Sequence, residues 1–159
     1  MKKPHFSIVV PVYNVAKTIG ETIESILSQS FTDFELIVQD NNSDDDTANI
    51  VNTYIDPRIK YYKNSSNLGY PQNLREGKKN CLGDILFLMA ADDILLEGSL
   101  DNTHSAFRSD ERVGAVTRPY YWYTTDIERP VRRTPRFNTG RNEIVSIDDK
   151  FSRVSLVLN

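Results

Sequence analysis

The sequence has little of several features that mark common protein classes. Its 159 residues include one cysteine, Cys81, so no disulfide can form within the chain and a reducing compartment fits. The apolar run near the start is short and is interrupted by Pro11, so we expect neither a signal peptide nor a membrane span. The net charge of −3 argues against a general nucleic-acid binder, which should be basic.

Two nucleotide-binding signatures of α/β proteins are also missing. No G-x-G-x-x-G follows the first apolar run, and no Walker lysine loop is present, which disfavours a dinucleotide fold and a P-loop fold. A phospho-receiver domain would need an acidic pair after its first strand, where this chain has Tyr13 and Asn14. The length suits one domain with a sizeable core.

What the sequence does contain is an alternation of strand and helix patterns. Short β-branched or apolar runs predict strands over residues 6–12, 34–40, 58–62, 85–91 and 113–118. Four helices are expected. The first begins near Thr18, where Thr18 and Glu21 have capping-box spacing, and a short one follows Thr47. The others run from Pro71 to about Asn80 and over 99–109. The alternation predicts an α/β fold with a mostly parallel central sheet flanked by helices.

The most informative stretch runs from Gly83 to Leu95. Its apolar part predicts a strand buried on both faces, as in the centre of a parallel sheet, and it ends in Asp92 and Asp93. Ligands of open α/β sheets bind beyond the carboxyl ends of the strands. The pair is interpreted as a divalent-metal site for a phosphorylated ligand, with a solvated acid pair as the alternative.

Four segments in this order and spacing resemble the family-2 glycosyltransferases of the GT-A fold, a Rossmann-like nucleotide-diphospho-sugar transferase fold. They are SIVVPVYN (7–14), FELIVQDNNSDDDT (34–47), NLGYPQNLREG (67–77) and GDILFLMAADDILL (83–96). The resemblance covers residues 5 to about 118. It implies a nucleotide-sugar-binding domain over 1–118 and the start of an acceptor-side region over 119–159.

The resemblance also implies roles for individual residues around the nucleoside. Pro11 and Tyr13 would line the base pocket, and Asp40 would accept a hydrogen bond from the base. Asn67, Gly69 and Asn73 match the loop that closes over ribose and base. Four of these residues have a plainer alternative: Tyr13 packed on a helix, Asp40 as a turn or cap acid, and turn chemistry for Asn67 and Gly69. Asp44, Asp45 and Asp46 are interpreted as capping and solvated residues.

Asp92 matches the last acid of the family's D-x-D motif, a metal ligand, and Asp93 supports the site or shares the metal. The implied cofactor is Mn²⁺ or Mg²⁺, which takes one or two carboxylates together with diphosphate oxygens and water. The first acid of the motif, a ribose contact, is Ala90 here. The general base is expected beyond residue 159, so this chain should transfer sugar poorly. Glu143, Asp148 and Asp149 are weak candidates for that base.

The implied function is inverting transfer from a UDP-sugar to the hydroxyl of a saccharide or lipid-linked acceptor, in polysaccharide, lipopolysaccharide or glycolipid synthesis. The alternatives are a non-catalytic nucleotide-sugar-binding module and an interaction module. The expected location is the cytoplasm, or the inner face of the membrane as a peripheral protein. The last third is rich in arginine, and this stretch is interpreted as a solvated loop or as a site for diphosphate or membrane lipid. A homodimer through the last third is also expected.

Overall fold

The computed structural model describes residues 2–117, 121–122, 132–133 and 156–157. These fall into two units, Met1–Gly98 and Ser99–Asn159, which are considered separately. The division expected at residue 118 stays a prediction. In the described part of the chain, no helix has the length and apolar character needed to cross a membrane.

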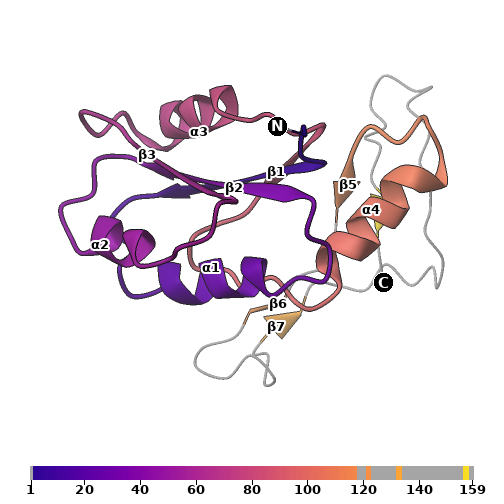
Figure 1. Cartoon of the computed structure of the whole chain (residues 1–159), viewed down its shortest axis with the longest axis horizontal. Coiled ribbons are helices and arrows are strands. Elements are labelled where there is room, and N and C mark those ends of the chain that lie inside the picture. The colour runs from indigo at the N-terminus through magenta and orange to yellow at the C-terminus, as the bar shows by residue number, and fades with distance from the viewer. Residues whose placement is uncertain (1, 118–120, 123–131, 134–155, 158–159) are drawn as a thin grey trace. The chain divides into compact units, whose positions relative to one another are not determined.

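The first unit is built on a four-stranded parallel sheet with the strand order β3-β2-β1-β4 (Figure 1). Its strands are β1 (Phe6–Val12), β2 (Phe34–Asp40), β3 (Ile59–Lys63) and β4 (Ile85–Leu88). The parallel register pairs Phe6 with both Phe34 and Ile85. This confirms the expected fold class, and the first two strands begin and end at the predicted residues.

Helices cover both faces of this sheet. Figure 1 shows α1 (Ile19–Leu27) and α2 (Thr47–Asn52) on one face and α3 (Tyr70–Lys79) on the other. α3 approaches closely because Gly77 has no side chain: a Cβ there would lie 2.8 Å from Val9 Cγ1. α1 lies against the core through three isoleucines spaced by three or four residues, Ile19, Ile23 and Ile26, all fully buried.

One expectation about the sheet is wrong. β4 was expected in the centre of the sheet, but in the described structure it is an edge strand next to β1. The side chains of Leu86 and Leu88 are 41% and 52% exposed, while Phe87 between them is buried. An alternating exposure is typical of a strand with one covered face. The strands buried on both faces are β1 and β2.

The expected capping box at α1 is also not formed. Thr18 is the N-cap residue, but its side chain makes no capping hydrogen bond. The Thr18 hydroxyl instead donates a weak hydrogen bond to the carbonyl of Val15, at 3.4 Å. The spacing of Thr18 and Glu21 was therefore correct for a helix start but not for the reciprocal bonds.

The second unit contains the helix α4 (Ser99–Ser109), at the predicted residues, and short strands. β5 (Val116–Thr117) pairs in parallel with β8 (Leu156–Val157), and β6 (Tyr121–Trp122) pairs antiparallel with β7 (Arg132–Arg133). Within it, Val116 packs against the buried Ala106 of α4. The remainder of the predicted acceptor-side region lies outside the described residues.

Candidate functional site

The predicted site residues gather at one edge of the sheet because its strands are parallel. β1, β2 and β4 are neighbours, so the residues that follow their carboxyl ends lie along the same edge. Tyr13 follows β1 and is 48% exposed, Asp40 ends β2, and Asp92 follows β4. Pro11, near the end of β1, is half-buried and pairs with Gln39 of β2.

The turns after β1 and β2 are joined to each other. Asn14 and Asn42 both have positive φ, 53° and 68°, a conformation that asparagine tolerates better than most residues. The backbone N–H of Asn14 donates to Ser43 Oγ at 2.9 Å, and Asn14 Oδ1 accepts from Asp44 N at 3.0 Å. This reciprocal pair holds the two turns at a fixed separation and so places Tyr13.

Asp40 is fully buried, and its carboxylate already has donors from the chain itself. Oδ1 accepts from the backbone N–H and the hydroxyl of Ser43, at 2.8 and 2.7 Å. Oδ2 accepts a short hydrogen bond from the Tyr61 hydroxyl. Burial, together with this hydrogen bond and the charge of Asp40, raises the pKa of Tyr61 above its ordinary value. A base contact by Asp40 stays a prediction, and its observed contacts organise the strand ends.

Asp45 caps the start of α2, as expected, and also bonds to the turn after β1, which the sequence did not indicate. Its two oxygens accept from Ala16 N, Thr47 N and Thr47 Oγ1, at 3.0, 2.9 and 2.5 Å. Asp45 therefore clamps the start of α2 to the turn after β1.

Beside Asp45 lies an open pocket of about 750 Å³, lined by Asn14, Ala16, Lys17, Asp44, Asp45, Asp46 and Asn49. Its acidic wall does not favour an anionic ligand.

The loop expected to close over the ribose has an ordered start. Asn67 Oδ1 accepts from the backbone N–H of Gly69 at 2.9 Å, which closes a tight turn within the loop. Gly69 has φ 77° and ψ 160°, a region that is essentially restricted to glycine. The plainer reading of these two residues, turn chemistry, accounts for both. Leu68 between them is 42% exposed.

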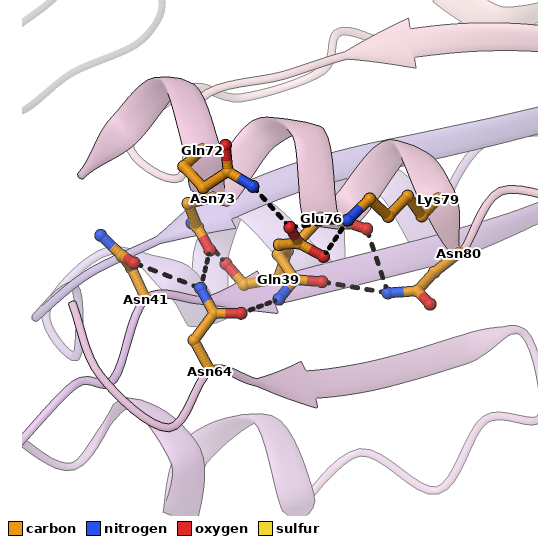
Figure 2. A network of polar contacts seen from close by, with 8 residues as sticks. All are labelled: Gln39, Asn41, Asn64, Gln72, Asn73, Glu76, Lys79 and Asn80. Carbon is orange, nitrogen blue, oxygen red and sulfur yellow. Dashed lines mark hydrogen bonds and ion pairs between the residues drawn. The ribbon is translucent and has the colours of Figure 1, made fainter. Parts of the chain in front are cut away.

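Side-chain amides connect this loop to the interior in one continuous series, and Figure 2 shows the part of it from Asn80 to Asn41. Asn80 Nδ2 donates to Gln39 Oε1, Gln39 Nε2 to Asn64 Oδ1, and Asn64 Nδ2 to Asn41 Oδ1, at 3.1, 2.9 and 3.2 Å. Asn41 Nδ2 then donates to Asn67 Oδ1 at 2.6 Å. Bonds that follow one another in the same direction polarise each other, so the series stabilises one conformation of the loop.

Asn73 belongs to this amide series and not to an open ligand surface. It is 2% exposed. Its Nδ2 donates to the carbonyl of Gln39 at 2.9 Å, and its Oδ1 accepts from Asn64 at 2.8 Å. Both polar atoms of the amide are therefore bonded within the chain, and Asn73 supports the loop through its bond to Asn64.

The acid pair after β4 is the open part of the site. Asp92 and Asp93 are both exposed. Although its surface is exposed, Asp93 loses part of its hydration to the surrounding chain, and this desolvation, together with the adjacent charge of Asp92, raises its pKa above the ordinary value of 3.8. Within the described residues, no cluster of three or more acidic, histidine or cysteine side chains could hold a metal by itself. Two adjacent carboxylates do fit Mg²⁺ or Mn²⁺, which complete their coordination with phosphate oxygens and water.

Sequence reasoning missed some of these residues and could not test others. Gln39, Asn41 and Asn64 were not singled out, although three polar amides at the ends of apolar strands were a visible signal. Glu143, Asp148 and Asp149, the weak candidates for a general base, lie outside the described residues. The Arg-rich stretch and the dimer surface predicted for the last third also lie almost wholly outside them.

Comparison with known families places the chain. The family model described as "Glycosyl transferase family 2" matches residues 7–153. The GalNAc(5)-diNAcBac-PP-undecaprenol beta-1,3-glucosyltransferase of Campylobacter jejuni is 37% identical over 100 residues, covering 61% of this chain and 32% of that protein. The Staphylococcus aureus poly(ribitol-phosphate) beta-N-acetylglucosaminyltransferase TarP is 34% identical over 111 residues, covering 66% and 33%. The chain spans between about a third and two-fifths of the length of such relatives.

Solved structures show the same fold. Residues 1–349 of S. aureus TarS, in complex with UDP-GlcNAc, superpose with a TM-score of 0.68 at 26% identity, over 72% of this chain and 34% of that one. A mannosyltransferase from Pyrobaculum calidifontis, in complex with GDP-Man and Mn²⁺, gives a TM-score of 0.62 at 26% identity, over 74% and 36%. These structures have the GT-A fold that the four sequence motifs predicted.

Proposed function

Because this chain belongs to the family-2 glycosyltransferases, we propose that it binds a UDP-sugar with Mn²⁺ or Mg²⁺ at the carboxyl edge of its sheet. The observation that carries the proposal is that the exposed acid pair, Asp92 and Asp93, follows β4, while Tyr13 follows β1, the strand that pairs with β4. A diphosphate between the pair and the turn after β1 would let the nucleoside extend toward Tyr13. The TarS complexes with UDP-GlcNAc and UDP support this choice of donor.

Each part of the edge contributes a separate function. Tyr13 offers an exposed aromatic face on which a base can stack. The loop at Asn67 and Gly69 supplies polar groups beside the nucleoside and is held in place by the amide series. Asp92, with Asp93 beside it, provides the oxygen ligands. A divalent cation bound there would stabilise the negative charge on the departing nucleoside diphosphate.

We propose that the reaction is an inverting transfer to an acceptor hydroxyl, in which a base removes the acceptor's proton as the sugar moves. The relatives' names support a saccharide or lipid-linked acceptor in cell-envelope polysaccharide synthesis. Such an acceptor favours a protein at the cytoplasmic face of the membrane. The second candidate is a module that binds the donor without catalysing transfer.

Calorimetric titration with UDP, with Mn²⁺ and with a chelator, tests the site directly. We expect much tighter binding with Mn²⁺ and loss of most of that difference in Asp92→Asn. The matched control is Asp84→Asn, since Asp84 is an exposed acid just before β4, at the end of that strand opposite the acid pair. Equal affinity with and without Mn²⁺ in the parent chain would refute the metal site, and equal affinity for UDP and GDP would refute the choice of base.

Sugar transfer and UDP release, measured in parallel, separate the two candidate functions. Transfer to a saccharide acceptor supports the transferase. If the protein binds the donor but releases no UDP with any acceptor tested, the result would support the non-catalytic module.

A further inference from the structure

The segment that follows the acid pair has no regular secondary structure of its own. Residues 93–96 form neither helix nor strand. The backbone hydrogen bond from Asp93 N to Ala90 O is long, at 3.4 Å. Backbone groups in a partly buried segment nonetheless need partners, so the question is what provides them.

Two side chains of α1, and that of Gln29 two residues beyond its end, provide these partners. Thr22 Oγ1 donates to the carbonyl of Asp93 at 2.9 Å. Ser25 Oγ accepts from Leu95 N at 3.0 Å. Gln29 Nε2 lies 3.1 Å from the carbonyl of Leu95 and 3.0 Å from that of Leu96. Four backbone groups of a four-residue segment are thus bonded to one row of three side chains.

The geometry of the row follows from helical spacing. Thr22, Ser25 and Gln29 are separated by three and four residues, so they lie along one side of the helix and its C-terminal extension. Thr22 is 1% exposed and Gln29 is 3% exposed. At such burial a hydrogen bond is stronger than in water, and losing one leaves a costly unpaired group. The row therefore determines the path of the backbone from Asp93 to Leu96.

This row does not explain how α1 attaches to the sheet. Ile19, Ile23 and Ile26 already bury the apolar side of the helix completely. The polar row faces a different element, and its first bond is to the carbonyl of Asp93, a residue of the acid pair. A row used only for packing could be apolar, as the neighbouring face is.

We propose that Thr22, Ser25 and Gln29 are positioning residues for the acid pair, holding the backbone after β4 so that its carboxylates meet the cation and the donor diphosphate. This inference rests on the proposed function, because it takes the pair as the cation site. Mg²⁺ requires near-ideal octahedral geometry, so a small displacement of the backbone would weaken coordination. The three residues need not touch the ligand themselves.

The test compares UDP affinity with Mn²⁺ and with a chelator, expressed as the ratio of the two dissociation constants. Thr22→Val keeps the shape and removes the hydroxyl, and Gln29→Met keeps the length and removes the amide. We expect each to lower the ratio by about tenfold, as replacing supporting partners of metal ligands commonly does, with little change in the chelator value. Thr22→Ser, which keeps the hydroxyl, should restore the ratio.

A matched control separates positioning from a general loss of stability. Thr103 of α4 is 3% exposed and donates to the carbonyl of Ser99 at 2.7 Å, so Thr103→Val deletes an equally buried hydroxyl elsewhere. The ratio should be unchanged in this variant. If Thr22→Val does not fold, Ser25→Ala serves instead, because Ser25 is only half-buried. Hydrogen exchange of the Leu95 amide should then be faster in Ser25→Ala than in the parent.

The outcomes distinguish the two proposals. If the parent chain binds UDP equally well with Mn²⁺ and with a chelator, so that the ratio is near one, the proposed function fails and this inference fails with it. A large parent ratio that Asp92→Asn abolishes, but that Thr22→Val and Gln29→Met leave unchanged, would overturn the positioning role alone. An equal loss in Thr103→Val would also overturn it.

Discussion

The contact between Tyr61 and Asp40 allows a direct test of what Asp40 does. The Asp40 carboxylate is fully buried and accepts hydrogen bonds from Ser43 and Tyr61. Tyr61→Phe removes one hydrogen bond to a charged acceptor, which is worth about 1.5–3 kcal/mol. If Asp40 acts mainly as the organising centre of the strand ends, this free energy should appear in the stability of the fold.

Asp40→Asn should destabilise the fold at least as much, because three donors lose their charged acceptor at once. The double variant should then cost less than the sum of the single variants, with a coupling energy of about 1.5 kcal/mol or more. Urea unfolding at constant pH measures all four corners of this cycle. Tyr54→Phe is the control, because Tyr54 bonds to the exposed Glu24 and to the Gly20 carbonyl at longer distances, 3.1 and 3.3 Å.

UDP titration of the same variants provides the refuting result. Affinity for UDP should stay within about twofold of the parent in Tyr61→Phe, equivalent to less than 0.5 kcal/mol. If Tyr61→Phe and Asp40→Asn each lose less than about 0.5 kcal/mol of stability, while Asp40→Asn binds UDP about tenfold more weakly, the reasoning fails. Asp40 would then be a base-recognition residue, as the family resemblance predicted.

Two further predictions concern the same edge of the sheet. The pKa of Tyr61 is raised in the folded state, so its contribution to stability is complete below the ordinary value of 10.0 and is lost as pH rises toward the folded pKa. In urea unfolding at alkaline pH, the parent should therefore lose stability more steeply with rising pH than Tyr61→Phe. Parallel losses in the two proteins would contradict this. Gly69→Ala should destabilise the fold by about 1–3 kcal/mol through backbone strain alone, since a Cβ there meets no atom within 4 Å. Gly114→Ala, where there is equal space and no positive φ, should change unfolding little, and equal losses would show that strain is not the cause.

Much of the architecture followed from local patterns. The first two strands and α4 begin and end where the sequence predicted them, because β-branched runs and helical spacing are properties of neighbouring residues. The four motifs were sufficient to indicate the GT-A fold and the edge of the sheet at which Tyr13 and Asp92 lie. The parallel topology then follows from the alternation of strands and helices.

Other features depend on residues far apart in the chain. An apolar run such as 85–91 looks the same in the centre of a sheet and at its edge, so only the strand order shows that Leu86 and Leu88 are exposed. The base contact predicted for Asp40 stays a prediction, but no sequence pattern indicated that Tyr61, 21 residues away, donates a hydrogen bond to it. The partners of a buried polar group are selected by packing and not by sequence spacing.

The sequence by itself determined the elements, their order and the chemistry available at the carboxyl edge, since these depend on residue type and short-range periodicity. Only the tertiary structure decided which polar side chains remain open to a ligand and which are bonded within the chain. Asp92 and Asp93 are exposed, whereas Asn73 is buried with both amide atoms bonded, and Thr22 and Gln29 bond to a segment more than 60 residues away. The physical reason is that folding removes polar groups from water, and each buried one must find a partner wherever the fold places one.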